Sequence, residues 1–480
     1  MKRSGLLTDL YELTMAQGYL LHDRNPRVVF DMFFRRQPFG GGYSIFAGLN
    51  DLIDDLEELS FSSEDIAYLE SSGLFHTKFL DYLSTFQFTG DLYAMQEGTT
   101  VFPGEPLLRV HSSLIEAQLI ESRLLNQINF QTLIATKTAR VYLASGRGKI
   151  MEFGLRRAQG PDGAMSASRA AYIGGAGATS NTLAGKEFGI PTSGTMAHSW
   201  VMAFDSERDA FEHYAELYPE KSILLIDTYD TLRSGINNAI EVGLELKKKG
   251  RSFGVRLDSG DIQYLSRRVR ERLNEAGLED AVIAVSNELD ETIIEQLVAH
   301  GAPVDLWGVG TSLVTGGSDS SLTGVYKLAA KETASGFEPT MKVSDNPSKT
   351  TNPGIKQVHR FYARDNTPIA DLVSFDEESW SPGEPVSFFH PDTDYRCFRL
   401  HEWIKAVPLL RQHMKGGKRI GAPEPLSELR ARALSGLEEF DDSFKRLINP
   451  HIYRVSITEI MKQTKLKIVT RFLDSRPIDE

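Results

Sequence analysis

The feature that most constrains the fold is a series of short apolar runs in the middle of the chain, each followed by a polar loop and a helix-like stretch. Continuous apolar strands that alternate with amphipathic helices are typical of a parallel sheet covered by helices. Six such units favour an α/β barrel over an open doubly wound sheet. No GxGxxG opens the helices, which weakens a dinucleotide-binding version of the open sheet. The runs are residues 150–154, the approach to 194–198, 222–227, 252–258, 281–286 and 304–310.

The two ends of the chain lack this alternation. We predict an N-terminal α+β domain over residues 1–125, the barrel with the active site over 126–364, and a C-terminal region over 365–480. Part of the C-terminal region is expected to join the N-terminal domain. A Pro-Gly-Glu-Pro turn occurs at both 103–106 and 382–385. It marks related hairpins of one β-rich domain, or it reflects chance and good turn chemistry.

The net charge restricts the possible partners. The chain has 480 residues and a formal net charge of −12. Binding a nucleic acid requires clustered Lys and Arg to neutralise phosphates, so no nucleic-acid partner is expected. An anionic small substrate remains compatible, because a site can be locally basic on an acidic protein.

The cysteine count and the N-terminal sequence point to the cytoplasm. Cys397 is the single cysteine, which excludes an intramolecular disulfide and a zinc site built from several cysteines. Asp9 and Glu12 interrupt the first apolar stretch, so no signal peptide is expected. No apolar run reaches the roughly 18 residues that a membrane span needs, so we expect no membrane association.

Polar side chains follow the predicted strands, where barrel enzymes carry their working residues. For a single Asp or Gly, a helix cap or a turn is the alternative interpretation. A set of consecutive strand ends that all carry Arg, Asp, His, Ser or Thr favours an active-site rim. These strand-end residues are Glu152, Phe153, Gly154, Arg156, Arg157, Gly194, Thr195, His198, Asp227, Thr228, Asp230, Arg256, Asp258, Ser259, Gly260, Asp261, Ser286, Asn287, Gly308, Gly310, Thr311 and Ser312.

The most specific element is the stretch 254–261, GVRLDSGD. Arg256 and Asp258 share one face of the strand end because side chains alternate with period two. The arginine offers a planar fork for a carboxylate or a phosphate. Asp258 and Asp261 can hold sugar hydroxyls or a hydrated Mg²⁺. The alternative is an internal Arg–Asp pair with Asp261 as a helix cap.

Two glycine-rich stretches differ in what they predict. Residues 307–312 run from a strand into a turn whose backbone N–H groups can cradle a phosphate. Residues 174–185 do not match the Walker A spacing, and we predict a helix with a small-residue face there. His198 is one of eleven histidines, and no close His spacing supports a metal site.

Six motifs, in order between residue 6 and about residue 330, resemble the nicotinate phosphoribosyltransferase family. The resemblance implies a type II phosphoribosyltransferase fold, an irregular parallel α/β barrel with an α+β domain from the N-terminal segment and part of the C-terminal region. It implies that nicotinate reacts with phosphoribosyl diphosphate to give nicotinate mononucleotide and diphosphate, a step of NAD salvage coupled to ATP hydrolysis through a phosphohistidine. The motifs are LLTDLYELTMAQGY (6–19), EFGLRRAQGPDG (152–163), SGTMAHSWVMAF (193–204), LLIDTYDT (224–231), GVRLDSGD (254–261) and GVGTS (308–312).

The resemblance also implies roles for individual residues. Tyr11 would stack on the pyridine ring from the partner subunit, which implies a homodimer, and Phe153 would stack on the other side. Thr195 and Arg256 would contact nicotinate, and His198 would carry the phosphate from ATP. His198, Arg256 and Asp258 form the expected catalytic set. The expected contacts of phosphoribosyl diphosphate are Arg156, Asp227, Asp258, Ser286, Asn287, Gly310 and Thr311.

The expected small molecules follow from the same resemblance. They are nicotinate, phosphoribosyl diphosphate and ATP, with Mg²⁺ accompanying the diphosphate groups; no structural zinc is expected with Cys397 alone. A nicotinamide or quinolinate phosphoribosyltransferase is the alternative within the fold. An unrelated sugar-phosphate aldolase or isomerase would need a strand-end lysine or a Glu/His base pair, and no lysine ends a predicted middle strand before Lys327. A non-catalytic binding protein of the same fold is a further alternative.

Overall fold

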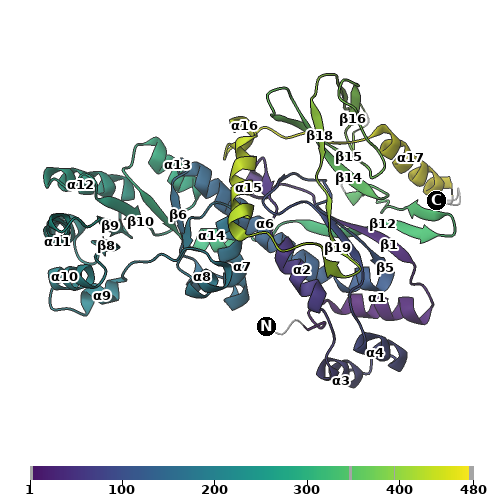
Figure 1. Ribbon diagram of the computed structural model, residues 1–480, viewed down its shortest axis with the longest axis horizontal. Coiled ribbons are helices and arrows are strands. Elements are labelled where there is room, and N and C mark those ends of the chain that lie inside the picture. The colour runs from purple at the N-terminus through teal and green to yellow at the C-terminus, as the bar shows by residue number, and fades with distance from the viewer. Residues whose placement is uncertain (1–3, 345–348, 394, 475–480) are drawn as a thin grey trace. The chain divides into compact units, whose positions relative to one another are not determined.

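The computed structural model describes residues 4–344, 349–393 and 395–474. They form two compact units, which Figure 1 shows with their elements labelled. The first unit comprises the chain up to Leu133 together with the chain from Ser321 on, and the second runs from Ile134 to Ser320. Among the described helices, none is long and apolar enough to cross a lipid bilayer.

The second unit is built on six strands that all run parallel. The sheet is an incomplete barrel, and this confirms the predicted class of a parallel sheet with irregular closure. In spatial order the strands are β7 (Ala178–Thr179), β6 (Lys149–Glu152), β11 (Leu306–Val309), β10 (Val282–Val285), β9 (Phe253–Leu257) and β8 (Ser222–Leu225).

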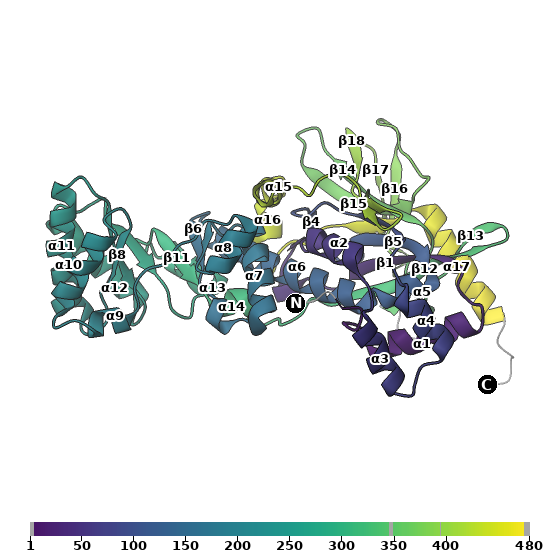
Figure 2. The same cartoon turned by 60° about the horizontal axis from the view of Figure 1, so that its bottom comes forward.

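Helices connect these strands and cover the sheet. Figure 2 shows α10 (Glu207–Leu217), α11 (Ile236–Lys248) and α12 (Ile262–Glu275) beside the strands around β8. Acidic caps fix where helices begin: Asp261 accepts from the Tyr264 N–H of α12, and Asp290 accepts from the Ile293 N–H of α13. The remaining helical elements are η2 (Leu155–Arg157), α7 (Gly160–Ile173), α8 (Thr182–Phe188), α9 (His198–Met202), η3 (Thr231–Gly235), α13 (Glu291–Ala299) and α14 (Thr311–Thr315).

Two local predictions in the second unit are wrong. The strand expected just before residue 194 is only an isolated parallel bridge between Thr179 and Thr192. The helix expected over 174–185 begins at Thr182, because the chain first turns and forms the two-residue strand β7. Asn181 caps the helix by accepting from the Ala184 N–H.

The first unit contains a seven-stranded sheet that draws on both ends of the chain. β1 lies between β5 and β12 and pairs antiparallel with both. The predicted domain made from both ends of the chain is therefore confirmed. In spatial order the strands are β13 (Gly336–Pro339), β12 (Gly324–Thr333), β1 (Arg27–Phe34), β5 (Leu108–Ser113), β3 (Asp91–Ala94), β19 (Arg411–Lys415) and β20 (Lys418–Arg419).

The unit boundaries differ from the predicted domain boundaries. The break between the units falls within α6 (Glu121–Ala144), at Leu133 and Ile134, rather than at 125 and 126. At the other end the second unit ends at Ser320 rather than at 364. The physical reason is that β12 pairs with β1, so the chain after Ser320 already belongs to the sheet of the first unit.

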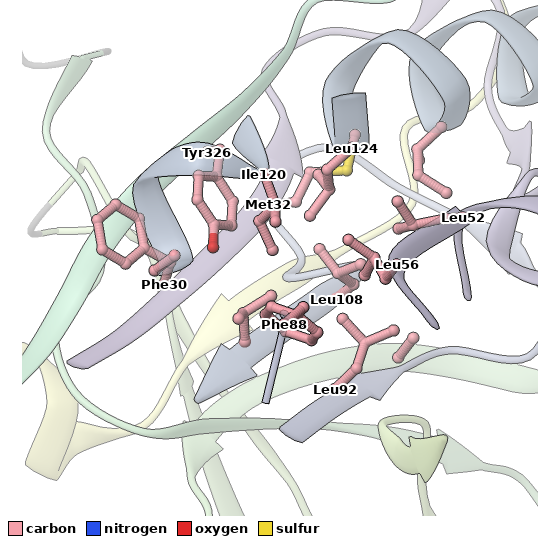
Figure 3. Close-up of a cluster of buried hydrophobic side chains, with 14 of the residues drawn as sticks. Phe30, Met32, Leu52, Leu56, Phe88, Leu92, Leu108, Ile120, Leu124 and Tyr326 are labelled. Atoms are coloured by element: carbon pink, nitrogen blue, oxygen red, sulfur yellow. The ribbon is translucent and has the colours of Figure 1, made fainter. Parts of the chain in front are cut away.

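The core of the first unit lies between this sheet and its helices. Figure 3 shows Met32 of β1 close to Leu124 of α6, and Phe30 of β1 beside Tyr326 of β12. The rings of Phe30 and Tyr326 stack with centroids 4.7 Å apart. Helices of this unit are α1 (Leu10–Leu21), α2 (Leu49–Glu58), α3 (Ser63–Ser71), α4 (Thr77–Ser84) and α5 (Leu114–Leu119), with η1 (Pro38–Gly40) and the strand pair β2 (Ser44–Ile45) and β4 (Thr100–Val101).

A third sheet comes from the C-terminal part of the chain. Arg360 and Asp371 form an ion pair inside it, with both side chains almost fully buried. Gly104 and Gly383, in the two Pro-Gly turns, both adopt positive φ, as a type II turn requires. The strands are β17 (Cys397–Leu400), β16 (Val386–Phe389), β21 (Val455–Ile457), β15 (Pro368–Phe375), β14 (Lys356–Tyr362) and β18 (Lys405–Pro408), followed or flanked by α15 (Leu426–Glu438), α16 (Asp442–Lys445) and α17 (Glu459–Asp474).

Candidate active site

Polar side chains at the carboxyl ends of β8, β9 and β10 meet around Arg256. The guanidinium donates from Nε to Ser286 Oγ at 2.8 Å and from one terminal nitrogen to Thr195 Oγ1 at 2.8 Å and to the Met196 carbonyl at 3.3 Å. Its other terminal nitrogen lies 3.1 Å from Asp258 Oδ1. Four of the five guanidinium N–H groups therefore face protein acceptors, and one is left for a ligand.

Asp258 connects Arg256 to His198. Its Oδ1 accepts from Ser286 Oγ at 2.5 Å and faces Arg256, while its Oδ2 lies 3.8 Å from His198 Nε2. Burial would raise the pKa of Asp258, but the hydrogen bond from Ser286 and the charge of Arg256 outweigh it and hold the pKa below its usual value. The carboxylate is therefore ionised at neutral pH, between a cation and an imidazole.

His198 begins the short helix α9 and is partly exposed, with 40 % of its side chain accessible. Its Nδ1 lies 3.1 Å from Thr228 Oγ1, and its Nε2 faces Asp258. Both ring nitrogens therefore have polar neighbours that orient the imidazole. The partial exposure leaves the ring accessible from solvent.

Asp227 completes the cluster from the end of β8. Its Oδ2 accepts from the Asp258 N–H at 2.8 Å and from Ser259 Oγ at 2.7 Å. Its Oδ1 is buried and has no hydrogen-bond partner among the described residues. A buried carboxylate oxygen without a partner is costly, and such a group is a common mark of a missing water or ion. Thr195, His198, Asp227, Thr228, Arg256, Asp258, Ser259 and Ser286 are called the Asp258 network below.

Phe153 lies against this network at the end of β6. The Arg256 guanidinium carbon is 5.9 Å from the centroid of its ring, within range of a cation–π contact. The Phe153 N–H donates to the Val309 carbonyl at 2.9 Å. A Cβ added at Gly308 would lie 2.7 Å from ring carbons of Phe153, so glycine is required for the ring to lie where it does.

Glu152 holds the backbone on which Phe153 is mounted. It is completely buried and accepts hydrogen bonds from the Gly154 N–H, from Ser168 Oγ at 2.8 Å and from Thr179 Oγ1 at 2.5 Å. These bonds fix the turn on both sides of Phe153. The turn is thus rigid before any ligand binds.

Other predicted site residues lie outside the Asp258 network. Arg156 is exposed on η2, and Asn287 is exposed with a φ of 111°. Gly310 and Thr311 open α14, where a Cβ on Gly310 would lie 3.2 Å from the Phe153 carbonyl oxygen. Asp261 caps α12 by accepting from the Tyr264 N–H. Tyr11 lies on α1 of the first unit and is 46 % exposed.

The sequence analysis did not assign roles to two residues of the network. Thr228 contacts His198, and Ser259 donates to Asp227. Both are among the strand-end residues expected at the active-site rim, because each directly follows a predicted strand. Arg256 also donates to the backbone carbonyl of Met196, and the identity of the Met196 side chain does not predict such a contact.

The network joins a cation, two carboxylates and an accessible imidazole beside an aromatic ring. The cation and the ring suit a flat ligand that bears a carboxylate. The carboxylates and hydroxyls suit a sugar or a hydrated metal ion. Among the described residues, the groups of this network can supply position and charge to a bound molecule.

Three family models match the chain along most of its length. Residues 6–129 match the nicotinate phosphoribosyltransferase N-terminal domain, residues 148–366 the nicotinate phosphoribosyltransferase family, and residues 355–465 the nicotinate phosphoribosyltransferase C-terminal domain. A nicotinate phosphoribosyltransferase of Bacillus subtilis (strain 168) is 42% identical over 474 residues, covering 96% of this chain and 94% of the relative. The chain belongs to the nicotinate phosphoribosyltransferase family.

More distant members of the family match over similar lengths. The nicotinate phosphoribosyltransferase of Homo sapiens is 34% identical over 95% of this chain and 94% of its own length. The crystal structure of the human nicotinic acid phosphoribosyltransferase superimposes with a TM-score of 0.84 and 31% identity, covering 96% of this chain and 99% of that chain. A nicotinate-nucleotide pyrophosphorylase from Pyrococcus furiosus, with a TM-score of 0.71 and 22% identity, covering 91% of this chain and 96% of that chain, shares the fold. The predicted family and fold class are confirmed.

Proposed function

We propose that this chain is a nicotinate phosphoribosyltransferase that couples ATP hydrolysis to the formation of nicotinate mononucleotide, the entry of nicotinate into NAD synthesis. The C1′–oxygen bond of phosphoribosyl diphosphate breaks, diphosphate leaves, and the pyridine nitrogen of nicotinate forms the new bond to C1′. The observation that carries the proposal is the Arg256 guanidinium held beside the Phe153 ring by Ser286, Thr195 and Asp258. This arrangement suits a flat ring with a carboxylate.

Nicotinate would bind with its ring on Phe153 and its carboxylate at Arg256. Thr195 orients the guanidinium through its hydroxyl oxygen. Tyr11, supplied by a second copy in a homodimer, would cover the other face of the ring; its 46 % exposure leaves the phenol available for such a contact. Ring stacking between two aromatics contributes about 0.5–1.5 kcal/mol per pair.

Phosphoribosyl diphosphate would bind next to this ring. Its 5′-phosphate suits the backbone N–H groups at Gly310 and Thr311, where α14 begins. Asp227 and Asp258, together with Ser286, would contact the ribose and the diphosphate, and Arg156 and Asn287 would contribute from the rim. The reaction passes through an oxocarbenium-like state, so the protein supplies position and charge rather than a nucleophile.

Mg²⁺ would be held chiefly by the diphosphate, because the described residues contain no group of three or more Asp, Glu, His or Cys side chains that could hold a metal ion. Asp258 is a predicted contact of the ion, and the partnerless Oδ1 of Asp227 is a further carboxylate oxygen nearby; Asp261, also predicted, caps α12 instead. Oxygen ligands of this kind are those that Mg²⁺ prefers. When bound, the ion neutralises charge on the departing diphosphate.

His198 would receive the γ-phosphoryl group of ATP on its imidazole and release ADP. Water later cleaves the phosphohistidine and releases phosphate. Asp258 would couple this step to nicotinate binding, because one carboxylate faces both His198 and Arg256. A phosphoryl group on His198 repels Asp258, weakens its pair with Arg256, and so frees guanidinium N–H groups for the carboxylate of nicotinate.

Replacing Gly308 with alanine is expected to disturb the proposed binding of nicotinate against the Phe153 ring. The new Cβ would lie 2.7 Å from the Phe153 ring and must displace it. We expect the KM for nicotinate to rise by about 3–10-fold, as the loss of one aromatic contact implies, with a loss of about 1–3 kcal/mol in the free energy of unfolding. Steady-state kinetics and thermal melting check both.

Gly163→Ala is the matched control. Gly163 lies in α7, and a Cβ there would lie 4.0 Å from its nearest neighbour, Gln159. We expect an unchanged KM and equal or higher stability, since alanine is favoured over glycine in helices by up to about 1 kcal/mol. An unchanged KM in a folded Gly308→Ala protein would mean that the Phe153 ring does not bind nicotinate.

One assay tests the proposed function directly. The purified chain is given phosphoribosyl diphosphate and Mg²⁺ with nicotinate or nicotinamide, with and without ATP, and mononucleotide formation is measured. We expect a preference for the acid of at least about 10²-fold, because the carboxylate accepts a charge-assisted hydrogen bond from the N–H of Arg256 that the protein leaves without an acceptor, and the neutral amide does not replace it. Equal use of the acid and the amide contradicts the proposal.

A further inference from the structure

Glu152 is a buried acidic side chain that the proposed reaction does not use. It is the last residue of β6 and is completely buried. Its hydrogen-bond donors in the described chain are the Gly154 N–H, Ser168 Oγ at 2.8 Å and Thr179 Oγ1 at 2.5 Å, and all three are neutral. A buried carboxylate without a cation is costly unless donors of this kind hold it. Each donor belongs to a different segment, namely the turn after β6, α7 and β7.

The first of these segments carries Phe153. Glu152 and Phe153 are neighbours at a strand end, so their side chains point to opposite faces of the sheet. Glu152 Oε1 accepts from the Gly154 N–H, directly after Phe153. Gly154 in turn packs on α14, since a Cβ there would lie 2.2 Å from the Val314 side chain. The backbone that follows Phe153 is therefore fixed on one side by the carboxylate and on the other by a helix.

The second segment, β7, aligns the stretch of chain that leads to Thr195. The Thr179 N–H donates to the Pro191 carbonyl at 3.0 Å, and the Ser193 N–H donates to the Thr179 carbonyl at 3.0 Å. Thr195 follows Ser193 two residues later. Glu152 Oε2 accepts from the side chain of the same Thr179. The carboxylate therefore fixes the strand residue against which this stretch is aligned.

Thr195 is one of the acceptors that hold the Arg256 guanidinium. Arg256 donates to Thr195 Oγ1 at 2.8 Å and to the neighbouring Met196 carbonyl at 3.3 Å. Because the guanidinium is planar and rigid, these two contacts help to set the direction of all its N–H groups, including the one left for a ligand. One buried carboxylate thus fixes the backbone of Phe153 and, through Thr179, the segment that orients the arginine fork.

An acid suits this place better than an amide of the same size. A carboxylate accepts on both oxygens, whereas the amide of glutamine accepts on its oxygen and donates from its nitrogen. Glu152 uses both oxygens, because Oε1 accepts from Gly154 while Oε2 accepts from Ser168 and Thr179. An amide that satisfied the Gly154 N–H with its oxygen would turn its own N–H groups toward the two hydroxyls. The link to Thr179 is therefore expected to weaken in a Glu152→Gln protein.

We propose that Glu152 is a positioning residue for nicotinate, which sets the spacing between the Phe153 ring and the Arg256 fork. It contacts no substrate, and it acts through the turn at Gly154 on one side and through Thr179 on the other. The inference rests on the proposed function, which assigns the pyridine ring to Phe153 and its carboxylate to Arg256. It deepens that function, because a fixed spacing selects flat acids whose carboxylate lies at a matching distance from the ring.

Thr179→Val tests the inference, because it removes the hydroxyl that Glu152 holds and keeps the size of the side chain. We expect the KM for nicotinate to rise by about 3–10-fold, the effect of one lost hydrogen bond. The kcat and the KM for phosphoribosyl diphosphate are expected to change by less than about twofold, as a loss of binding to one substrate implies. The preference for nicotinate over nicotinamide is expected to fall by about 3–10-fold, because the amide makes no charge-assisted bond with the displaced fork.

Thr138→Val is the matched control. Thr138 is a completely buried threonine of α6 in the same unit, and its hydroxyl donates to the Ile134 carbonyl at 2.8 Å within its own helix. The variant loses a buried hydroxyl of the same kind that is not bonded to Glu152. We expect its KM for nicotinate and its preference for the acid to equal those of the unaltered protein.

Glu152→Gln changes the other partner of the same bond. It is expected to raise the KM for nicotinate by a similar factor of about 3–10. Adding Thr179→Val to Glu152→Gln is expected to raise the KM little further, because both changes weaken one bond. Fully multiplied effects would mean that the two residues act separately, and they would overturn the inference. If Glu152→Gln does not fold, the result with Thr179→Val decides alone.

The outcomes distinguish this inference from the function on which it rests. A folded Thr179→Val protein with an unchanged KM and an unchanged preference overturns the positioning role, and so does an equal loss with nicotinate and nicotinamide. Both results leave the proposed function standing, because the unaltered protein still prefers the acid. Failure of the unaltered protein to form mononucleotide from nicotinate contradicts the function itself, and it is seen before any variant is compared.

Discussion

Replacing Arg256 with lysine is expected to lower kcat/KM for nicotinate by about 10²–10⁴-fold, because two hydrogen bonds to a charged group are worth about 1.5–3 kcal/mol each. Lysine keeps the charge but loses the planar fork that Ser286, Thr195 and Asp258 hold in place. Activity with nicotinamide, which has no carboxylate to lose, is expected to fall much less. The preference for the acid therefore shrinks toward unity in a steady-state comparison of the two substrates.

Arg268→Lys is the matched control for this experiment. Arg268 lies on α12, the helix that follows the same strand, is 53% exposed, and pairs only with the nearby Glu271 in the described chain. An exposed pair of this kind contributes about 0.3–0.5 kcal/mol at most, so the kinetics should not change. If Arg256→Lys lowers the rate with nicotinate and nicotinamide by the same factor, Arg256 does not recognise the carboxylate.

Incubation with γ-labelled ATP is expected to label the protein at His198, and His198→Ala is expected to carry no label. The variant should also lose the enhancement of kcat/KM by ATP, a coupling that typically amounts to about 1–3 kcal/mol or roughly 5–150-fold. ATP-independent transfer of the phosphoribosyl group should persist, because the variant keeps Arg256, Phe153 and the proposed 5′-phosphate site at Gly310 and Thr311. The reason is structural: the polar neighbours of His198 are Asp258 and Thr228, which belong to neither the Phe153 ring nor the turn at Gly310.

His213→Ala controls for non-specific labelling. His213 is a comparably exposed histidine of α10, 58% accessible, and its Nδ1 lies 3.9 Å from the carboxylate of Glu216. The His213→Ala variant should be labelled by ATP, and its activity stimulated by ATP, to the same extent as the unaltered protein. Label that persists in His198→Ala would refute the phosphohistidine, and loss of all transfer in that variant would show that His198 acts in the transfer step itself.

Much of the fold could be predicted where the pattern is local. Five of the six apolar runs became strands of the parallel sheet, because strands buried on both faces are continuously apolar. The strand predicted just before residue 194 does not form, because this segment contributes only a single bridge at Thr192 to the sheet. One bridge is too short to produce a recognisable strand pattern. The limit of the second compact unit, at Ser320 rather than near 364, could not be read from local spacing: β12 pairs with β1, a partner some three hundred positions away, and local spacing carries no trace of such a pair.

The contacts of the active site could likewise be predicted only where they depend on local sequence. Alternation along β9 places Arg256 and Asp258 on one face, and the structure joins them at 3.1 Å. The same rule cannot show that Ser286, from a different strand, lies between them, or that Asp258 reaches His198 with its second oxygen. Those contacts depend on strand order. The role of Tyr11 came from the family resemblance alone, and it remains a prediction.

The interrupted first unit has a consequence for how the chain is made. The second unit is continuous from Ile134 to Ser320, so it can fold as soon as it leaves the ribosome. β1 is synthesised near the start, yet one of its two neighbours, β12, begins only at Gly324. Until then, the nascent chain presents an apolar strand with an unpaired edge, the kind of surface that templates aggregation. Synthesis order therefore leaves this edge of β1 without its strand partner until about two thirds of the chain has been made.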